Sequence, residues 1–377
     1  MSNAITGRPV RIGIIGCGQI AQQHLANYAK IPEAEVVACA DILPSAADTS
    51  AATFGIPHVY YTAQEMLKRD DLDAVDVCLH NNLHMPGATA VLESGRPCYC
   101  EKPMAGTYAD AAAMIETARA AGLPLHIQLA GLYRDEVRAA KDLIDAGELG
   151  DVYHARSTGH RRRGRPFVDG YGKPSFVQKQ NSGGGALYDM GVYHISELLF
   201  LLGNPAPDRI TGKTYQKIAM DEKRRAEAGY SVEELGMGFV RFAGGDLSLD
   251  IIEAWAIHLD QMEGSVIVGS EGGVRLGPPF GFFKSVGDLD VNGTASMGAA
   301  NYRWRKLRTE DGDTDLRASS QSHWVAHLQG KTDLLPTAEI ALNTMLISEG
   351  IYLSEKQGRE VTADEVRERS VSTALTL

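Results

Sequence analysis

The sequence predicts an α/β protein of two domains, in which a helix-covered parallel sheet is followed by a second domain built on another sheet. Its length of 377 residues is more than a single hydrophobic core usually occupies. The first third alternates short apolar runs with helical patterns, which is typical of a parallel sheet. After Gly150 the pattern changes to the alternation of half-exposed antiparallel strands.

The first domain is expected over residues 8–131. Its predicted strands are the apolar runs 11–15, 35–41, 74–79, 97–100 and 124–129. Its predicted helices, the last of which leads into the second domain, cover 20–29, 45–54, 63–68, 84–94, 108–121 and 136–146. Gly95, Gly122 and Gly147 follow three of these helices, at the position where glycine often ends a helix.

The second domain is expected over residues 132–377. Its predicted strands lie within 151–160, 236–255, 264–268 and 273–276, and a long amphipathic helix is predicted over 336–355. The segment 160–184 is polar, rich in glycine and arginine, and long for a loop without secondary structure. Loops of that length in a compact domain are usually functional or disordered.

Charge and composition exclude several classes of function. The formal net charge of -11 argues against nucleic acids and anionic membrane surfaces as partners. We find neither a membrane segment nor the pattern of a secretory signal, so a cytoplasmic location is expected. The five cysteines contain no Cys-x-x-Cys pair, so we expect neither a disulfide framework nor a metal site.

A glycine turn follows the first predicted strand, with the pattern Gly-x-Gly-x-x-Ala from Gly16 to Ala21. Gly16 permits a tight turn, Gly18 lets the backbone approach a pyrophosphate, and Ala21 lets the helix pack on the strand. The phosphates would then meet the positive end of the helix. The pattern predicts a dinucleotide site. The alternative interpretation is an ordinary turn of small residues that binds no ligand.

Asp41 ends the second predicted strand, at the spacing where an acid accepts hydrogen bonds from ribose hydroxyls. The following residues, Ile42, Leu43 and Pro44, provide no cation for a 2′-phosphate. NAD is therefore favoured over NADP. The alternative for Asp41 is a loop acid or a helix cap.

Two further motifs carry candidate chemistry. Lys102, within Glu101-Lys102-Pro103, follows a predicted parallel strand, where desolvation would lower the pKa of its amine and let it polarise a substrate oxygen. The glycine run 183–185 enters a predicted helix that continues to Leu202, on which Asp189 and Tyr193 share a face and His194 falls on an apolar stripe. The alternative for Lys102 is a solvated surface lysine. For Asp189 and Tyr193 it is a solvated helix face, and for His194 a histidine packed in the core.

In this order the motifs resemble the family of glucose-fructose oxidoreductase, inositol dehydrogenase and the related rhizopine-catabolism proteins. The resemblance covers nearly the whole chain and rests on residues 16–21, Asp41, 101–103, 143–150, 183–191 and 269–273. It implies an N-terminal Rossmann domain plus a C-terminal α+β domain with a large, mostly antiparallel open sheet. Such sheets often mediate assembly, so a homodimer or homotetramer is expected.

The resemblance also implies roles for individual residues. Lys102, often joined to its proline by a cis bond, would contact the reacting oxygen, and Asp189 and Tyr193 would complete the catalytic site. Many relatives carry histidine where this chain has Tyr193, so His194 is kept as the reserve proton carrier. The implied cofactor contacts are Gly16, Gly18, Gln19, Ile20, Asp41, Leu79, Asn81, His84, Glu101, Lys102 and Gln128. The candidate substrate contacts are Lys102, Tyr153, Arg163, Phe176, Lys179, Asp189 and Tyr193.

The function implied is an NAD-dependent oxidoreductase that transfers hydride between nicotinamide and a secondary alcohol or anomeric carbon of a sugar, sugar derivative or cyclitol. A first alternative is a glycoside-cleaving enzyme that oxidises the ring transiently and eliminates the leaving group. A second is a regulator that binds dinucleotide without catalysis. The arginines between Arg161 and Arg165 could clamp an anionic or hydroxyl-rich substrate, or form a solvated or subunit-bridging loop.

Overall fold

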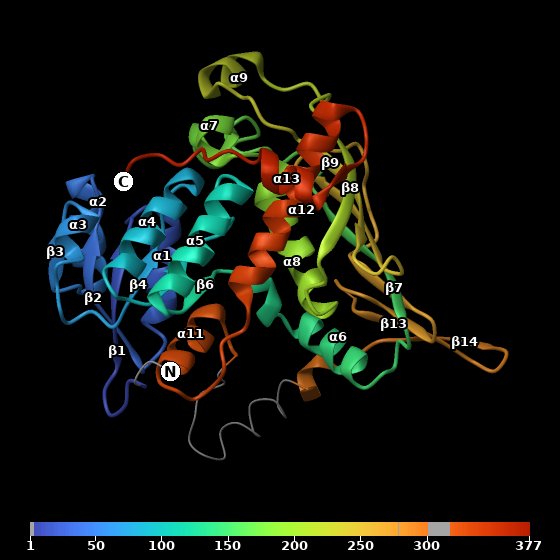
Figure 1. The fold of residues 1–377 in the computed structure, drawn as a ribbon, viewed down its shortest axis with the longest axis horizontal. Coiled ribbons are helices and arrows are strands. Elements are labelled where there is room, and N and C mark those ends of the chain that lie inside the picture. The colour runs from blue at the N-terminus through green and yellow to red at the C-terminus, as the bar shows by residue number, and fades with distance from the viewer. Residues whose placement is uncertain (1–3, 278, 301–316) are drawn as a thin grey trace.

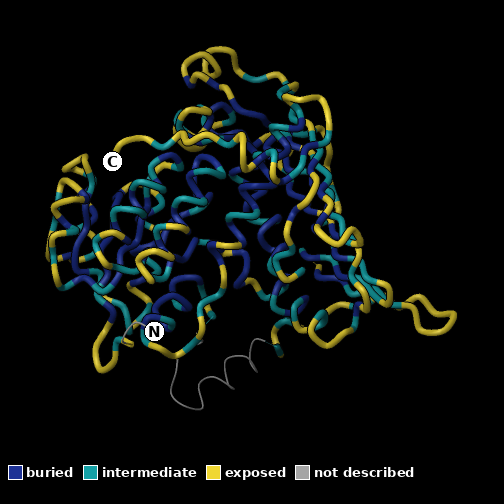
Figure 2. Tube along the Cα trace, in the orientation of Figure 1, coloured by how far each residue is buried: buried dark blue, intermediate teal, exposed yellow. Residues whose placement is uncertain are grey.

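The computed structural model describes residues 4–277, 279–300 and 317–377, and in them a six-stranded and a nine-stranded sheet are joined through a layer of helices (Figure 1). The predicted α/β class and the change of sheet type along the chain are confirmed. Buried residues concentrate in the first sheet and in the helices between the two sheets, whereas the outer hairpin of the second sheet is exposed (Figure 2).

The first sheet has the strand order β3-β2-β1-β4-β5-β6, and all of its strands are parallel. The strands are β1 (Val10–Ile15), β2 (Ala34–Ala40), β3 (His58–Tyr60), β4 (Ala74–Val77), β5 (Cys98–Cys100) and β6 (Leu125–Ile127). This order is that of the Rossmann fold. Because the strands are parallel, the turns that follow β1, β2, β4 and β5 all lie at one edge of the sheet.

The helices of this part lie within a few residues of their predicted positions. They are α1 (Gln19–Tyr28), α2 (Pro44–Phe54), α3 (Ala63–Met66), α4 (Asn81–Glu93), α5 (Tyr108–Ala121) and α6 (Asp135–Asp145). Gly122 ends α5 with a left-handed φ of 64°, as glycine at a helix end predicts.

One more helix packs on the first sheet from far along the chain. In α11 (Ser320–Leu328), Trp324 is fully buried in the same core as Val10 and Ile12 of β1. The first sheet therefore takes a helix from the segment assigned to the second domain. The domain boundary after residue 131 stays a prediction.

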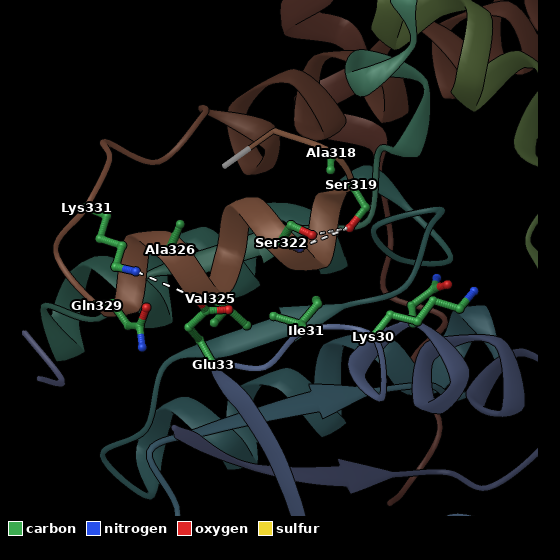
Figure 3. A pocket seen from close by; sticks show the side chains of 11 residues that line it. Lys30, Ile31, Glu33, Ala318, Ser319, Ser322, Val325, Ala326, Gln329 and Lys331 are labelled. Atoms are coloured by element: carbon green, nitrogen blue, oxygen red, sulfur yellow. Dashed lines mark hydrogen bonds and ion pairs between the residues drawn. The ribbon is translucent and has the colours of Figure 1, made fainter. Parts of the chain in front are cut away.

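A hollow lies between α11 and the turn that follows α1 (Figure 3). Ile31, Glu33, Ser322 and Lys331 are among its lining residues. This turn lies at the opposite end of α1 from the glycine turn, about 15 Å away along a helix of ten residues. The hollow is therefore separate from the dinucleotide edge of the sheet.

The second sheet has the order β14-β13-β12-β11-β7-β10-β9-β8-β15. Its strands are β7 (Val152–His160), β8 (Pro207–Tyr215), β9 (Leu235–Phe242), β10 (Ser248–Ala254), β11 (Val266–Gly269), β12 (Gly272–Arg275), β13 (Gly281–Val286), β14 (Leu289–Gly293) and β15 (Val361–Thr362). The predicted antiparallel pattern holds for every pair except β7 and β10, which run parallel. The sheet is thus mostly antiparallel, as predicted, and the long connection between β7 and β10 permits their parallel crossover.

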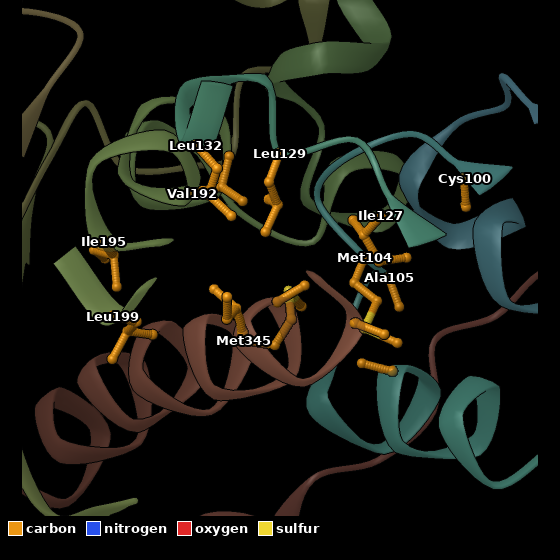
Figure 4. Packing of buried hydrophobic residues seen from close by; sticks show 14 of the residues in the cluster. Cys100, Met104, Ala105, Ile127, Leu129, Leu132, Val192, Ile195, Leu199 and Met345 are labelled. Carbon is orange, nitrogen blue, oxygen red and sulfur yellow. The ribbon is translucent and has the colours of Figure 1, made fainter. Parts of the chain in front are cut away.

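The long helix predicted near the C-terminus is present as α12 (Thr337–Gln357), which ties the two sheets together. Its predicted amphipathic character is wrong, because the helix lies between the two sheets and is buried on nearly every side. Its Met345 packs in one core with Ile195 and Leu199 of α8 (Val192–Leu201), and with Leu129 after β6 (Figure 4). The carboxyl edge of the first sheet and the start of α8 are thus held in a fixed relation. Across the described part of the chain, no helix is long and apolar enough to cross a membrane.

Candidate active site

The glycine turn has the geometry that its sequence predicts. Gly16 adopts a φ of 90°, and a Cβ there would lie 2.4 Å from the carbonyl oxygen of Cys78. Gly18 is exposed at the start of α1, where a Cβ would meet nothing within 4 Å. No side chain caps this end of α1, so its first N–H groups are free to donate. The turn fits the phosphates of a dinucleotide.

The two glycines differ in a way that stability measurements can detect. Gly16→Ala is expected to lower the free energy of unfolding by roughly 1–3 kcal/mol or more, because it combines a left-handed φ with overlap on Cys78. Gly18→Ala places its methyl in open space at a φ of −72°, so its effect on unfolding is expected to be small. Urea unfolding without dinucleotide makes the comparison, and equal stabilities would contradict this description of the turn.

Asp41 lies directly over the glycine turn. Its carboxylate accepts one hydrogen bond from Cys17 N (2.7 Å) and another from Leu43 N (2.8 Å). Leu43, and not Asp41, is the N-cap of α2, so the helix-cap alternative does not apply. Each oxygen keeps a further lone pair for a hydroxyl donor.

Lys102 lies in the turn after β5 and reaches across to the second part of the chain. Its Nζ lies 3.2 Å from Asp189 Oδ1 and 3.3 Å from the Asp189 carbonyl oxygen. The same Nζ lies 4.3 Å from the centroid of the Tyr193 ring. The peptide bond between Lys102 and Pro103 is cis, as the resemblance implies. The structure thus brings Lys102 together with Asp189 and Tyr193, two predicted catalytic residues from a distant part of the sequence.

The charges of this cluster correct one expectation. Burial alone would lower the pKa of Lys102, but the attraction of Asp189, followed by that of Tyr193, outweighs it and raises this pKa. The prediction of a lowered lysine pKa is therefore wrong. Burial would raise the pKa of Asp189, but Lys102 and a hydrogen bond from Trp255 Nε1 (2.9 Å) hold it below its usual value. The pair is an ammonium and a carboxylate.

The segment that carries Asp189 is not the continuous α-helix that was predicted. Leu187–Gly191 forms a π-helical turn before α8 begins. The backbone N–H groups of Gly185 and Leu187 donate to the buried carboxylate of Glu233 at 2.9 to 3.0 Å. π-turns of this kind occur frequently at functional sites.

His194 faces a different partner from Tyr193. Its Nδ1 lies 2.9 Å from Glu253 Oε2, and Glu253 is fully buried and also accepts from Ser157 Oγ. Burial would lower the pKa of His194, but Glu253 raises it above the ordinary value. Neither Glu253 nor Trp255 is among the residues that the sequence pattern predicts for the site, although both lie at the end of the predicted strand region 236–255.

The remaining cofactor candidates fall into two groups. Gln19, Ile20 and Leu79 border the glycine turn, and Gln128 follows β6 with a buried Oε1 that no donor among the described residues reaches. Such an unsatisfied acceptor fits a ligand donor.

In the second group the polar groups bond to the protein itself. Asn81 Nδ2 donates to Ser182 O (2.7 Å), and the His84 ring lies between Pro103 O and Leu79 O at 2.7 and 3.0 Å. Glu101 bonds to His24 and to Lys102 N at 2.9 and 2.8 Å. These residues shape the edge of the site.

Four substrate candidates are placed away from this cluster or face solvent. Tyr153 lies at the start of β7, whereas the site lies near the end of that strand. Arg163 and Phe176 are exposed, and Lys179 Nζ lies 5.4 Å from the centroid of the Tyr352 ring. Their role in binding substrate stays a prediction.

The arginines of the loop 160–184 serve different purposes. Arg165 is buried and pairs with Asp169 and Glu234, each at 2.9 Å, so it holds the loop in place. Arg161 instead bonds to Tyr171, and its charge contributes to lowering the pKa of Asp189. Of the two, Arg161 is the one whose charge reaches Asp189.

Comparison with known proteins assigns the chain to a family. Residues 10–129 match the oxidoreductase family with an NAD-binding Rossmann fold named Gfo/Idh/MocA, and residues 137–275 match the C-terminal domain of the same family. The chain belongs to the Gfo/Idh/MocA family. Among Gfo/Idh/MocA relatives, D-glucoside 3-dehydrogenase of Escherichia coli (strain K12) is 28% identical over 368 residues, covering 96% of this chain and 99% of that protein.

Solved structures share the fold. Levoglucosan dehydrogenase in complex with NADH has a TM-score of 0.79 at 19% identity, covering 94% of this chain and 99% of that one. The WlbA dehydrogenase of Bordetella pertussis, in complex with NADH and UDP-GlcNAcA, has a TM-score of 0.76 at 22% identity, covering 95% and 99%. The resemblance to Gfo/Idh/MocA proteins is confirmed, and the chain is an oxidoreductase with a Rossmann domain for a nicotinamide dinucleotide.

Proposed function

We propose that this Gfo/Idh/MocA protein is an NAD-dependent dehydrogenase that oxidises a secondary alcohol or anomeric carbon of a sugar, sugar derivative or cyclitol. The observation that carries the proposal is the cluster of Lys102, Asp189 and Tyr193 at the carboxyl edge of the Rossmann sheet. Ligands bind at this edge in open α/β sheets. Relatives named D-glucoside 3-dehydrogenase and levoglucosan dehydrogenase support a sugar substrate.

Each side chain has a distinct part in the proposed reaction. Lys102 donates a hydrogen bond to the substrate oxygen, and Asp189 keeps the ammonium in place through the contact at 3.2 Å. Tyr193 takes the proton from the substrate hydroxyl as the bond to carbon becomes a carbonyl. The Lys102 ammonium, 4.3 Å from the centroid of the Tyr193 ring, supplies the positive charge that stabilises the phenolate. When bound, nicotinamide supplies the acceptor for the hydride.

The environment of Asp189 suits a neutral polyol. Trp255 and Lys102 each occupy one of its two carboxylate oxygens, and each oxygen retains a lone pair for a substrate hydroxyl. The side chain of Asp189 is 28% exposed and that of Lys102 is 12% exposed, so both can be reached from solvent. Arg161 and Tyr171 form a polar border beside them.

The preference for NAD is part of the proposal and can be measured separately. Asp41→Asn is expected to raise KM for NAD by about tenfold, which corresponds to about 1.4 kcal/mol, because a charged hydrogen-bond acceptor for ribose is lost. KM for NADP should fall or stay unchanged, because repulsion of the 2′-phosphate is relieved. Asp48→Asn is the matched control, since Asp48 is an exposed acid on α2 that bonds to Tyr61 and not to the glycine turn. If Asp41→Asn left the ratio of KM for NAD to KM for NADP unchanged, Asp41 would not be the residue that selects NAD.

The proposed reaction is tested by incubating the protein with NAD and a panel of monosaccharides, uronic acids, glycosides and inositols. We expect NADH to accumulate together with an oxidised substrate of intact skeleton. Cleavage of a glycoside without net NADH would instead favour the glycoside-cleaving alternative. Dinucleotide binding without turnover on the whole panel would favour the non-catalytic regulator.

A further inference from the structure

A buried histidine beneath the glycine turn lies between two carboxylates. His24 of α1 places Nδ1 2.8 Å from Asp76 Oδ2 of β4, and Nε2 2.9 Å from Glu101 Oε1 after β5. The three residues are 1%, 0% and 5% exposed, so these contacts are shielded from bulk solvent. A ring that bonds to ionised carboxylates through both nitrogens needs a proton on each, which only the imidazolium has.

The other groups that face this ring are uncharged. Cys78 Sγ lies 3.3 Å from Nδ1, and burial raises the pKa of this thiol to about 12. Burial likewise raises the phenol pKa of Tyr28 and of Tyr99, whose ring meets His24 edge-on at 5.8 Å. Burial alone would lower the pKa of His24, but the attraction of Asp76 outweighs it and raises this pKa well above its usual value. The ring is therefore a cation between two anions.

The same carboxylate that His24 holds also holds the backbone of Lys102. Glu101 Oε2 accepts the Lys102 N–H at 2.8 Å, while Oε1 is occupied by His24. On its other side Lys102 reaches Asp189 through Nζ. Charges thus alternate in sign from Asp76 through His24, Glu101 and Lys102 to Asp189.

We propose that His24 is a positioning residue, which fixes the Glu101 carboxylate and through it the backbone and ammonium of Lys102. The part of the inference that concerns catalysis rests on the proposed function. Without the cation, two buried carboxylates lose their common partner, and one of them takes up a proton because isolated buried charges are costly. Glu101 then no longer holds Lys102 N in place. His24 contacts neither Asp41 nor the N–H groups at the start of α1 in the structure, so dinucleotide affinity should change little.

The first test compares His24→Gln with His126→Gln in the full-length protein. His126 is equally buried but lies between the hydroxyls of Thr337 and Ser320, and no carboxylate among the described residues bonds to it. We expect His24→Gln to lower kcat by roughly ten- to a hundredfold, because small displacements of a catalytic group cost this much. NAD affinity should stay unchanged, and His126→Gln should keep its kcat. Equal loss of kcat in both variants would overturn the proposal.

A double-mutant cycle separates action through Glu101 from general damage. If His24 acts through this carboxylate, then His24→Gln combined with Glu101→Gln should lose no more activity than the worse single variant. Losses that multiply would show that the two residues act independently and would overturn the proposal.

Two further measurements do not depend on turnover. They can therefore test the role of His24 even if the proposed function is wrong. Nitrogen NMR at about pH 8 should find both ring nitrogens of His24 protonated, whereas an unperturbed histidine is neutral there. The rate at which acetic anhydride labels Lys102 should change in His24→Gln and not in His126→Gln. A ring with one proton, or an unchanged labelling rate, would overturn the proposal. His24, Asp76 and Cys78 also lie close enough to hold a metal ion. Zinc that binds to the wild-type protein and not to His24→Gln would therefore overturn the proposal as well.

Discussion

Replacing Lys102 with Ala is expected to lower kcat by roughly a hundredfold to ten-thousandfold while NAD still binds. The ammonium lies 3.2 Å from Asp189 Oδ1 and over the Tyr193 ring, and its removal deprives the phenol of the cation beside it. The glycine turn and Asp41 do not touch Lys102 Nζ, so the adenosine half of the dinucleotide keeps its contacts. Steady-state rates together with NAD fluorescence titration measure both quantities.

Lys102→Arg is the conservative partner of this variant. It keeps the charge but not the compact ammonium, so its loss of kcat should be smaller than that of Lys102→Ala. If Lys102→Ala retained wild-type kcat, or lost NAD binding and activity to the same extent, Lys102 would not be the catalytic lysine.

Tyr193→Phe is expected to lower kcat by a similar factor, because it removes the proposed proton acceptor and keeps the ring over Lys102. The phenylalanine ring can still lie against the Lys102 ammonium, so NAD binding should change little. Steady-state kcat and NAD titrations of the two proteins make the comparison, and a wild-type kcat in Tyr193→Phe would contradict its role as the base.

His194→Ala is the matched variant for Tyr193→Phe. It leaves the buried carboxylate of Glu253 without its ring partner, so its main effect should be a lower free energy of unfolding, by about 3–5 kcal/mol as for other broken buried pairs. The folded variant should keep most of its kcat. A folded His194→Ala protein without turnover, beside an active Tyr193→Phe, would transfer the role of base to His194.

The fold and the dinucleotide edge could be predicted from the sequence because they depend on local patterns. Strand, glycine turn and helix follow one another between residues 10 and 28, and Asp41 stands at a fixed spacing from them. The parallel pairing of β7 with β10 could not be predicted, since it depends on how a long crossover returns to the sheet.

The electrostatics of the site depend on contacts between distant residues. Lys102 stood at a strand end where desolvation alone lowers a lysine pKa, and the sequence did not reveal that Asp189 lies 3.2 Å away. Trp255 and the pair of His24 with Asp76 were missed for the same reason. The loop arginines are alike in sequence, and only the packing separates buried Arg165 from Arg161.

The most direct test of the proposed chemistry follows deuterium from the substrate. A sugar or cyclitol that reduces NAD in the panel is prepared with deuterium on the carbon that becomes oxidised, and the NADH formed is analysed by mass spectrometry. Direct hydride transfer predicts that the NADH formed by the wild-type protein carries the deuterium. In Lys102→Ala, the rate of NADH formation should be reduced by the same factor for labelled and unlabelled substrate. NADH without deuterium, or a cleaved glycoside with no NADH, would contradict the assignment as a dehydrogenase.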